Sequence, residues 1–261
     1  MMITAGIDVG NKNTRALILK DREVISRSLV LSDFDHKKAA LYSYELALSK
    51  AHMNKEDVNF IMATGAGQEE VTFANGRITE VGSAARGAVF LFSSTRTVID
   101  VGAEESRAIK IDEKGKVLDF AINEKCAAGT GSFVESMSRA LEITLEEMGA
   151  LSLKGEKSVP MNAQCAVFAE SEVVSLIHAR IPVENIAKSI HEAMASRISS
   201  MVRRIGIQKE VLLIGGTAYN KGFIAAMEED LELKLIVPAD YPEFISAFGA
   251  ALVAADKAGG K

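Results

Sequence analysis

Two cysteines are the residues of this chain whose type and setting suit metal or redox chemistry. Cys126 stands directly before the small-residue stretch Ala127-Ala128-Gly129-Thr130-Gly131, and Cys165 stands before Ala166-Val167-Phe168. Each context predicts a turn that opens a helix, where the helix dipole and N–H groups stabilise a thiolate. Thiolates select zinc, copper(I) or an iron–sulfur cluster, whereas a cysteine in a chain of this kind is more often a small core residue than a ligand. The residues alone leave both alternatives open.

A cysteine site in one copy of this chain would be incomplete. Zinc and [4Fe–4S] sites both require four ligands, and the chain contains two cysteines. The histidines show no metal-ligand spacing and stand apart from both cysteines in sequence: His36, His52, His178 and His191. A site completed by cysteines would therefore borrow two of them from a second subunit.

The glycine turn Gly6-Ile7-Asp8-Val9-Gly10 suits the binding of a polyanion. Gly10 lets backbone N–H groups approach phosphate oxygens, as in an anion-binding nest. Asp8 could hold the water shell of Mg²⁺, which prefers one or two carboxylates together with phosphate oxygens. The next residues belong to the same predicted phosphate site, with side-chain donors among them: Asn11, Lys12, Asn13 and Thr14.

A second turn, Asp100-Val101-Gly102-Ala103, would contact the phosphates from the opposite side. Asp100 is a catalytic candidate, and Gly102 and Ala103 are the candidate phosphate contacts. Glu104 or Glu105 could serve as a general base or as an acceptor for Mg²⁺-bound water, or could be a solvated surface carboxylate.

A third turn, Gly215-Gly216, follows an apolar strand and suits the close approach of a flat ring and its ribose. We assign Thr217 and Asn220 to the same predicted site, and we expect Gly129-Thr130-Gly131 to lie near it. A single glycine turn is more often only the end of a strand, since such motifs have many false positives. Three turns in this order favour a nucleotide site.

The first and second turns belong to an internal repeat. An offset of 92 residues lays Val98-Ile99-Asp100-Val101-Gly102 on Gly6-Ile7-Asp8-Val9-Gly10, and six pairs between 7–19 and 99–111 are identical. Both copies predict a strand meander, which indicates a duplication. We therefore predict two domains built alike, over 1–96 with the C-terminal helix 243–261, and over 97–242.

Apolar spacing predicts the remaining elements. One amphipathic helix follows Cys126, with Val134, Met137, Leu141, Leu145 and Met148 on its apolar face, and another follows Cys165. A long helix runs through Ile186 to Ile205, and Gly206 ends it. We expect further helices over 36–52, 83–92, 221–230 and 243–257, and strands over 58–63, 116–122, 211–214 and 235–237.

The composition of the chain argues against a nucleic-acid-binding, membrane-spanning or secreted protein. The chain has 261 residues, 48% of them apolar, and a net charge of −5, which argues against a nucleic-acid surface. We find no apolar run long enough to span a membrane and no secretory signal, so we expect a cytoplasmic protein without membrane or nucleic-acid partners.

The three turns in this order resemble those of the actin, Hsp70 and sugar-kinase ATPase superfamily. The resemblance implies an α/β fold of two duplicated actin-like (ribonuclease-H-like) ATPase domains that bind ATP or ADP with Mg²⁺ in a cleft between them. A small-molecule kinase or a non-catalytic ATP-binding regulator on this fold stays an alternative. A kinase would need a general base for its acceptor, for which Asp100 is the best candidate.

The cysteine stretches resemble a narrower family, the ATPase activators of 2-hydroxyacyl-CoA dehydratases and the ATPase subunits of benzoyl-CoA reductase. The matching residues are Glu124-Lys125-Cys126-Ala127-Ala128-Gly129-Thr130-Gly131 and Cys165-Ala166-Val167-Phe168-Ala169-Glu170-Ser171-Glu172. The resemblance implies a [4Fe–4S] cluster shared across a subunit interface, with Cys126 and Cys165 as ligands from each subunit. It also implies ATP-coupled delivery of low-potential electrons from ferredoxin or flavodoxin to iron–sulfur reductase subunits that act on an acyl-CoA.

One departure in sequence favours one branch of this family over the other. The dehydratase activators carry Asp-Ile-Gly-Gly-Gln-Asp at the second phosphate turn, where this chain has Asp100-Val101-Gly102-Ala103-Glu104-Glu105. The Ala-Glu-Glu version is more similar to a benzoyl-CoA reductase ATPase subunit, which pairs with a sister ATPase subunit. We therefore predict a subunit of benzoyl-CoA reductase, with a homodimeric dehydratase activator as the alternative.

Overall fold

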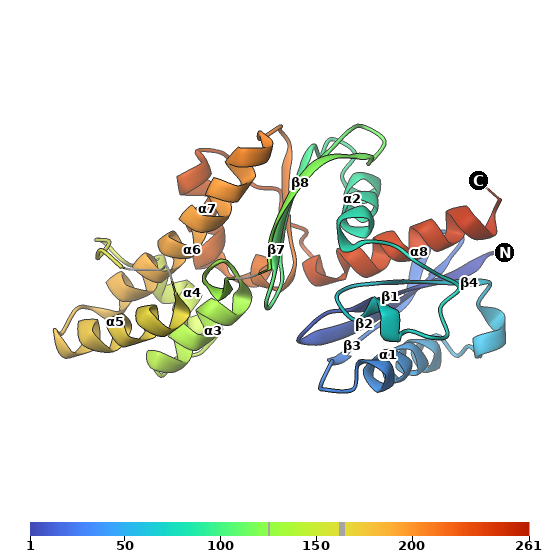
Figure 1. Ribbon diagram of the computed structural model, residues 1–261, viewed down its shortest axis with the longest axis horizontal. Coiled ribbons are helices and arrows are strands. Elements are labelled where there is room, and N and C mark those ends of the chain that lie inside the picture. Colours follow the sequence, from blue (N-terminus) through green and yellow to red (C-terminus); the bar gives the residue numbers. More distant parts are fainter. Residues whose placement is uncertain (125, 162–164, 261) are drawn as a thin grey trace. The chain divides into compact units, whose positions relative to one another are not determined.

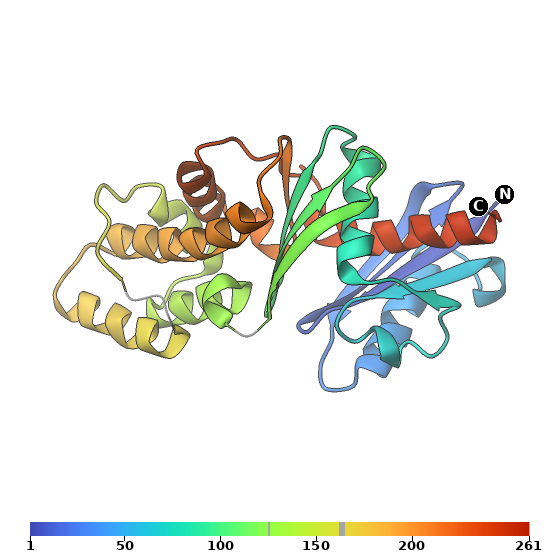
Figure 2. The same cartoon turned by 45° about the horizontal axis from the view of Figure 1, so that its top comes forward.

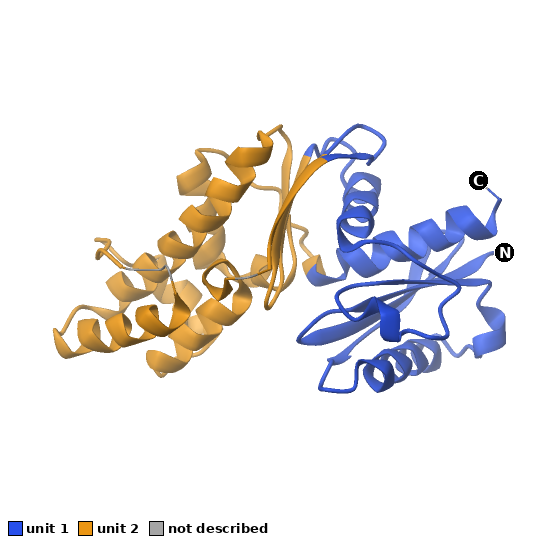
Figure 3. Ribbon diagram, in the orientation of Figure 1, with its two compact units in different colours: residues 1–96, 111–118, 243–261 blue, residues 97–110, 119–242 orange. Residues whose placement is uncertain are grey.

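The computed structural model describes residues 1–124, 126–161 and 165–260, and the chain divides into two compact units (Figure 3). Unit 1 comprises Met1–Arg96, Ile111–Leu118 and Glu243–Lys261, and unit 2 comprises Thr97–Lys110 and Asp119–Pro242. Each unit has its own sheet (Figure 1).

The sheet of unit 1 has the order β3-β2-β1-β4-β5. The predicted meander is present as the antiparallel strands β1 (Ile3–Val9), β2 (Asn13–Lys20) and β3 (Glu23–Leu31). Strand β4 (Phe60–Thr64) pairs parallel with β1, and the short β5 (Gly76–Arg77) lies at the edge. All seven residues of β1 are buried because it is the central strand.

Helices cover both faces of this sheet. Helix α1 (His36–Lys50) packs on β2 and β3, and its Tyr44 lies in one core cluster with Ile7. On the other face, α8 (Ile245–Ala258) packs on β1 and β4 and against α2 (Glu80–Leu91). The Thr4 hydroxyl donates to the carbonyl of Ala251 in α8 at 3.0 Å. Alternate residues of β1 thus face α1 and α8, as the pleat requires.

The sheet of unit 2 has the order β8-β7-β6-β9. Strands β6 (Thr97–Val101) and β7 (Ser106–Ile111) are antiparallel, and β8 (Val117–Asn123) forms the edge. Strand β9 (Val211–Ile214) pairs parallel with β6, as β4 does with β1 in unit 1. The expected strand at 235–237 is reduced to an isolated bridge between Ile236 and Leu212.

Five helices of unit 2 gather on one side of its sheet (Figure 2). They are α3 (Gly131–Ala140), α4 (Leu145–Ser152), α5 (Ala166–His178), α6 (Val183–Ile205) and α7 (Lys221–Leu231). The apolar face predicted for α6 is Ile186, Ile190, Met194, Ile198, Met201 and Ile205. All of these are buried except Met201, which is half-buried, and Gly206 ends the helix with φ of 76°. The prediction for this helix is confirmed.

The prediction of a single helix after Cys126 is wrong. The apolar spacing from Val134 to Met148 spans two helices, α3 and α4, which Glu142 separates with φ of 57°. Helix α4 then starts afresh at Thr144, whose side chain and that of Glu147 form a capping box. Apolar periodicity persisted through the break because both helices bury one face in the same core.

Within the described ranges, no helix is long and apolar enough to cross a membrane. The mixed α/β architecture with two sheets agrees with the predicted fold class. The domain boundaries, the duplication of whole domains and the nucleotide cleft stay predictions.

Candidate functional site

The first phosphate turn joins β1 to β2. The Gly10 N–H donates to the Asn13 carbonyl at 3.1 Å, which closes a tight hairpin. Asn11 and Asn13 are half-buried and Lys12 is exposed at the tip of this turn, whereas Asp8 and Thr14 are buried at its base. The predicted phosphate contacts therefore lie together at one end of the sheet.

Ser32, which the sequence did not single out, holds this turn from the end of β3. Its N–H donates to the Lys12 carbonyl at 3.0 Å, and its hydroxyl donates to the Gly10 carbonyl. The hydroxyls of Ser32 and Thr14 lie 2.9 Å apart, so the Thr14 side chain supports the turn from inside the fold. A serine at a strand end carries no signal of this role in sequence.

Asp8 is buried with an arginine partner. Its carboxylate accepts a hydrogen bond from Nη1 of Arg15, directly across the β1–β2 ladder, at 3.4 Å. Gly65, directly after β4, has φ of 92°, and a Cβ there would lie 2.6 Å from Oδ1 of Asp8 and 2.5 Å from the Val9 carbonyl. Only glycine fits beside this carboxylate.

The second phosphate turn repeats these features in unit 2. Asp100 accepts from Nη1 of Arg107, across the β6–β7 ladder, at 3.3 Å. Gly215, directly after β9, has φ of 93°, and a Cβ there would lie 2.9 Å from Oδ1 of Asp100. The turn closes through a bond of 2.9 Å from the Gly102 N–H to the Glu105 carbonyl.

The two glutamates of this turn differ. Glu105 is half-buried and forms an ion pair with Nη2 of Arg107, whereas Glu104 is exposed. The two carboxylates that the sequence left equivalent therefore have distinct surroundings, and their roles in hydrolysis stay predictions.

The start of α3 is bonded to the second phosphate turn. The Gly131 N–H donates to the Gly102 carbonyl at 2.9 Å, and the Ser132 N–H donates to the Ala103 carbonyl at 2.8 Å. The Ser132 hydroxyl also donates to the Ala103 carbonyl. These bonds place Gly131 beside the second phosphate turn, and they engage the amide groups expected to stabilise a thiolate.

The third turn meets the second within unit 2. The Thr217 hydroxyl donates to the Val101 carbonyl at 3.3 Å, and a Cβ on Gly131 would lie 3.4 Å from the Thr217 methyl group. A Cβ on Gly216 would meet nothing within 4 Å, so one side of this residue is open. Open space beside Gly216 is consistent with the predicted approach of a ring.

Asn220 is turned toward the helices. Its Oδ1 accepts from the Phe223 N–H at 3.1 Å, which caps α7, and its Nδ2 lies 3.0 Å from Nε2 of His191 on α6. Burial lowers the pKa of His191 to about 4, so this imidazole is neutral at pH 7. The carboxamide of Asn220 is thus used within the fold, and His191 is its partner.

Cys126 is half-buried and packs against the core of unit 2. A 3-10 turn, Ala127–Gly129, separates it from α3, so the predicted turn between Cys126 and a helix is present. Its carbonyl accepts from the Asn123 side chain at 2.8 Å. The Thr130 hydroxyl donates to the Ala127 carbonyl at 2.7 Å and is buried, which steadies the same turn.

Gly129 lies on the other side of this turn from Gly131. It lines a cavity together with Asn123 and Ser106 of the sheet and residues of α6. Because Ser106 and Arg107 are consecutive strand residues, the cavity and the Asp100–Arg107 pair are on opposite faces of the sheet. Gly129 therefore borders this cavity, and a Cβ on it would lie 3.6 Å from Oγ of Ser106, the residue that follows the second phosphate turn.

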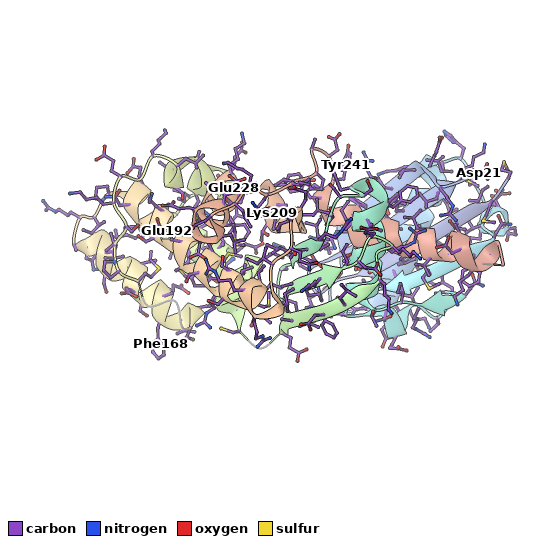
Figure 4. The ribbon with its side chains drawn as sticks, turned by 90° about the horizontal axis from the view of Figure 1, so that it is seen from above. Asp21, Phe168, Glu192, Lys209, Glu228 and Tyr241 are labelled. Atoms are coloured by element: carbon purple, nitrogen blue, oxygen red, sulfur yellow. The ribbon has the colours of Figure 1, made fainter. Side chains whose placement is uncertain are left out.

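Cys165 caps the N-terminus of α5, as predicted, and it is half-buried. Residues 125 and 162–164, which flank the two cysteines, lie outside the described residues. Val167 and Phe168 follow it with 69% and 66% of their surface exposed, and Phe168 points away from the helix (Figure 4). Exposed apolar side chains beside a thiol are typical of a surface that another chain covers.

The donor set fits a cluster that is shared between two chains. Helices α3 and α5, which follow the two cysteines, pack against each other. Across the described ranges, no group of three or more His, Cys, Asp or Glu side chains could hold a metal ion. Among the described residues, one chain therefore offers two half-buried cysteines toward the four ligands that such a site needs.

Comparison with known proteins identifies the family. The model of the BadF/BadG/BcrA/BcrD ATPase family matches residues 5–254. This chain belongs to that family. It is 37% identical over 257 residues to the 2-hydroxyisocaproyl-CoA dehydratase activator of Clostridioides difficile, covering 98% of this chain and 96% of the relative. It is 34% identical over 262 residues to a benzoyl-CoA reductase subunit of Thauera aromatica, covering 97% and 93%.

Solved structures agree with the sequence relatives. Component A of the (R)-2-hydroxyglutaryl-CoA dehydratase of Acidaminococcus fermentans superposes with a TM-score of 0.94 at 36% identity, covering 99% of this chain and 100% of that one. The activator of the 2-hydroxyisocaproyl-CoA dehydratase from Clostridium difficile with bound ADPNP gives 0.93 at 36% identity, with coverages of 99% and 96%.

A more distant likeness concerns the fold alone. A ROK family glucokinase from Streptomyces griseus gives a TM-score of 0.62 at 12% identity, covering 97% of this chain and 99% of that one. The chain therefore has the actin-like, sugar-kinase-like ATPase fold.

Proposed function

We propose that this chain is an ATP-hydrolysing activator of a 2-hydroxyacyl-CoA dehydratase, working as a homodimer. The observation that carries this proposal is the likeness to component A of a dehydratase over 99% of the chain, at a TM-score of 0.94. Identity to a dehydratase activator, 37%, also exceeds the 34% to the benzoyl-CoA reductase relative. The prediction of a benzoyl-CoA reductase subunit, which rested on one loop, is therefore replaced by its alternative.

Nucleotide binding would use the glycine turns of both units. The relative with bound ADPNP supports ATP as the ligand. Backbone N–H groups near Gly10 and Gly102 would face phosphate oxygens, and Asp8 and Asp100 would hold the water shell of Mg²⁺. The open side of Gly216 would accept the adenosine.

Cys126 and Cys165 would hold a [4Fe–4S] cluster together with the same two cysteines of a second copy. When bound, the cluster would supply one low-potential electron, received from ferredoxin or flavodoxin, to the partner dehydratase. The chain's own part is to present two accessible thiols and, with Val167 and Phe168, an apolar surface for the second copy.

Anaerobic purification tests the cluster. We expect a brown homodimer of two 28.0 kDa chains with about four irons and acid-labile sulfide per dimer. Substituting either cysteine, Cys126→Ser or Cys165→Ser, removes the iron, whereas Ser171→Ala on the exposed side of α5 keeps it. A colourless, iron-free wild-type dimer would contradict this part of the proposal.

The nucleotide site has a separate test. Asp8→Ala should abolish Mg-ATP hydrolysis while the visible spectrum of the cluster stays intact, because Asp8 and the cysteines belong to different units. Unchanged turnover would remove Asp8 from this role.

A benzoyl-CoA reductase ATPase subunit is the second candidate, favoured by the Ala103-Glu104-Glu105 loop and by the relative at 34% identity. Native mass measurement distinguishes the two. A homodimer with a full complement of iron, able to activate a dehydratase, supports the first function. A chain that takes up iron only with an unlike ATPase subunit supports the second.

A further inference from the structure

Arg107 lies beneath the second phosphate turn and contacts a carboxylate at each end of it. Nη1 is 3.3 Å from Oδ2 of Asp100, which begins the turn, and Nη2 pairs with Oε2 of Glu105, which ends it. The side chains of Arg107 and Asp100 are 7% and 10% exposed. This guanidinium therefore links both ends of the turn in a place that solvent screens little.

The equivalent arginine of unit 1 pairs with one carboxylate among the described residues. Arg15 contacts Asp8 at 3.4 Å, and it also donates to the Asn13 carbonyl oxygen at 3.3 Å. The first turn is held instead by Ser32 through the Lys12 and Gly10 carbonyls. The two turns thus share an arginine but differ in what closes them.

We propose that Arg107 is a positioning residue that sets the shape of the second phosphate turn by holding Asp100 and Glu105 together. The proposal rests on the proposed function where it concerns ATP, but its structural part holds for the nucleotide-free chain. A planar guanidinium offers two donors in fixed geometry, so it can fix two carboxylates at once.

Arg107 would hold the turn in shape because it is the cation that Asp100 and Glu105 share. With Arg107, two carboxylates share one cation, and without it Asp100 and Glu105 would be two like charges that have lost their shared counter-ion. Removal of one partner from a buried ion pair leaves an uncompensated charge. Glu105 would then turn toward solvent, and the carbonyls of Gly102 and Ala103 would lose their alignment with the amides of Gly131 and Ser132.

Amide hydrogen exchange without nucleotide tests the structural part. In Arg107→Gln we expect the Gly131 and Ser132 amides to exchange about ten- to a hundredfold faster, the factor for losing a hydrogen bond to a charged group. Arg107→Lys should restore part of this protection. Arg15→Gln, the matched change in unit 1, should leave both amides as in the wild type.

Steady-state kinetics test the functional part. We expect Arg107→Gln to lower kcat for Mg-ATP hydrolysis by about ten- to a hundredfold, with a smaller change in KM, because the misplaced turn costs more in the transition state. Arg107→Lys should recover part of kcat. If the wild type proves inactive, the proposed function fails, and the exchange experiment still decides the role of Arg107.

A double variant shows whether Arg107 acts through Glu105. Glu105→Gln removes the charge that Arg107 holds, so the exchange rates of Arg107→Gln/Glu105→Gln should be no faster than those of Arg107→Gln alone. Wild-type exchange in Arg107→Gln, or effects of the two substitutions that simply multiply, would overturn the proposal. Should Arg107→Gln fail to fold, Arg107→Lys and Glu105→Gln give the same readout.

Discussion

The two phosphate turns share three residues and differ in what surrounds them. Each has an aspartate at a strand end, an arginine across the ladder and a glycine of positive φ against the aspartate carboxylate. In unit 1 Arg15 contacts Asp8, whereas in unit 2 Arg107 contacts both Asp100 and Glu105. The comparison separates the parts that both sites need, the glycine and the ion pair, from those that give each turn its shape.

The glycines should give the largest effects and test how alike the two sites are. A Cβ at Gly65 or Gly215 would lie 2.5 Å or 2.4 Å from a backbone carbonyl oxygen. Gly65→Ala and Gly215→Ala should each destabilise the protein by roughly 3–5 kcal/mol in urea unfolding, from positive φ and overpacking together.

Gly216→Ala is the control for these variants, because its added Cβ meets nothing within 4 Å. It should change the unfolding free energy by less than about 0.5 kcal/mol. A large cost at Gly215 with none at Gly65 would end the equivalence of the two sites.

His191, which contacts Asn220 in unit 2, should make the free energy of unfolding depend on pH. Burial lowers its pKa to about 4 from the ordinary 6.5, so between these values the unfolded chain binds more protons than the folded one. The contribution of His191 to the free energy of unfolding is therefore fully present above pH 6.5. It decreases by up to about 3 kcal/mol as the pH falls to 4. Urea unfolding of the wild type and His191→Gln over this range should show a shallower pH dependence for the variant. Parallel curves would exclude His191 as the titrating group.

The serines should give the smallest effects and sharpen the difference between the turns. Ser32→Ala removes a hydroxyl that bonds Gly10 and Thr14 in unit 1, at a cost of about 1–2 kcal/mol. Ser132→Ala in unit 2 should cost less than about 1 kcal/mol, because its N–H still donates to Ala103. Equal costs, measured by urea unfolding, would show that side chains hold both turns alike.

Much of the local structure could be predicted because it depends on neighbours in sequence. The apolar run of β1, the meander after it and the apolar face of α6 all follow from local sequence patterns. The break at Glu142 could not, because apolar spacing continues across it while the backbone turns into a left-handed conformation.

The site also contains residues that the sequence could identify and residues that only the structure identifies. Asp8, Gly10 and the cysteines carry recognisable motifs, so sequence singled them out. Ser32 and His191 act through partners that the fold brings near, such as the Gly10 carbonyl from 22 residues away and the Asn220 side chain from 29 residues away. The branch of the family was predicted from a three-residue loop, whereas identity over the whole chain favours the alternative branch.

Two backbone hydrogen bonds tie the start of α3 to the second phosphate turn, so the helix is expected to move together with the turn. The helix has ten residues, which is about 15 Å, so a tilt of about 10° at the turn moves its far end by roughly 3 Å. The chain between the turn's carbonyls and Cys126 consists of Gly131 and the four residues before it. A small displacement at the phosphate turn would therefore be passed through this short stretch toward Cys126 and along α3 toward Ala140.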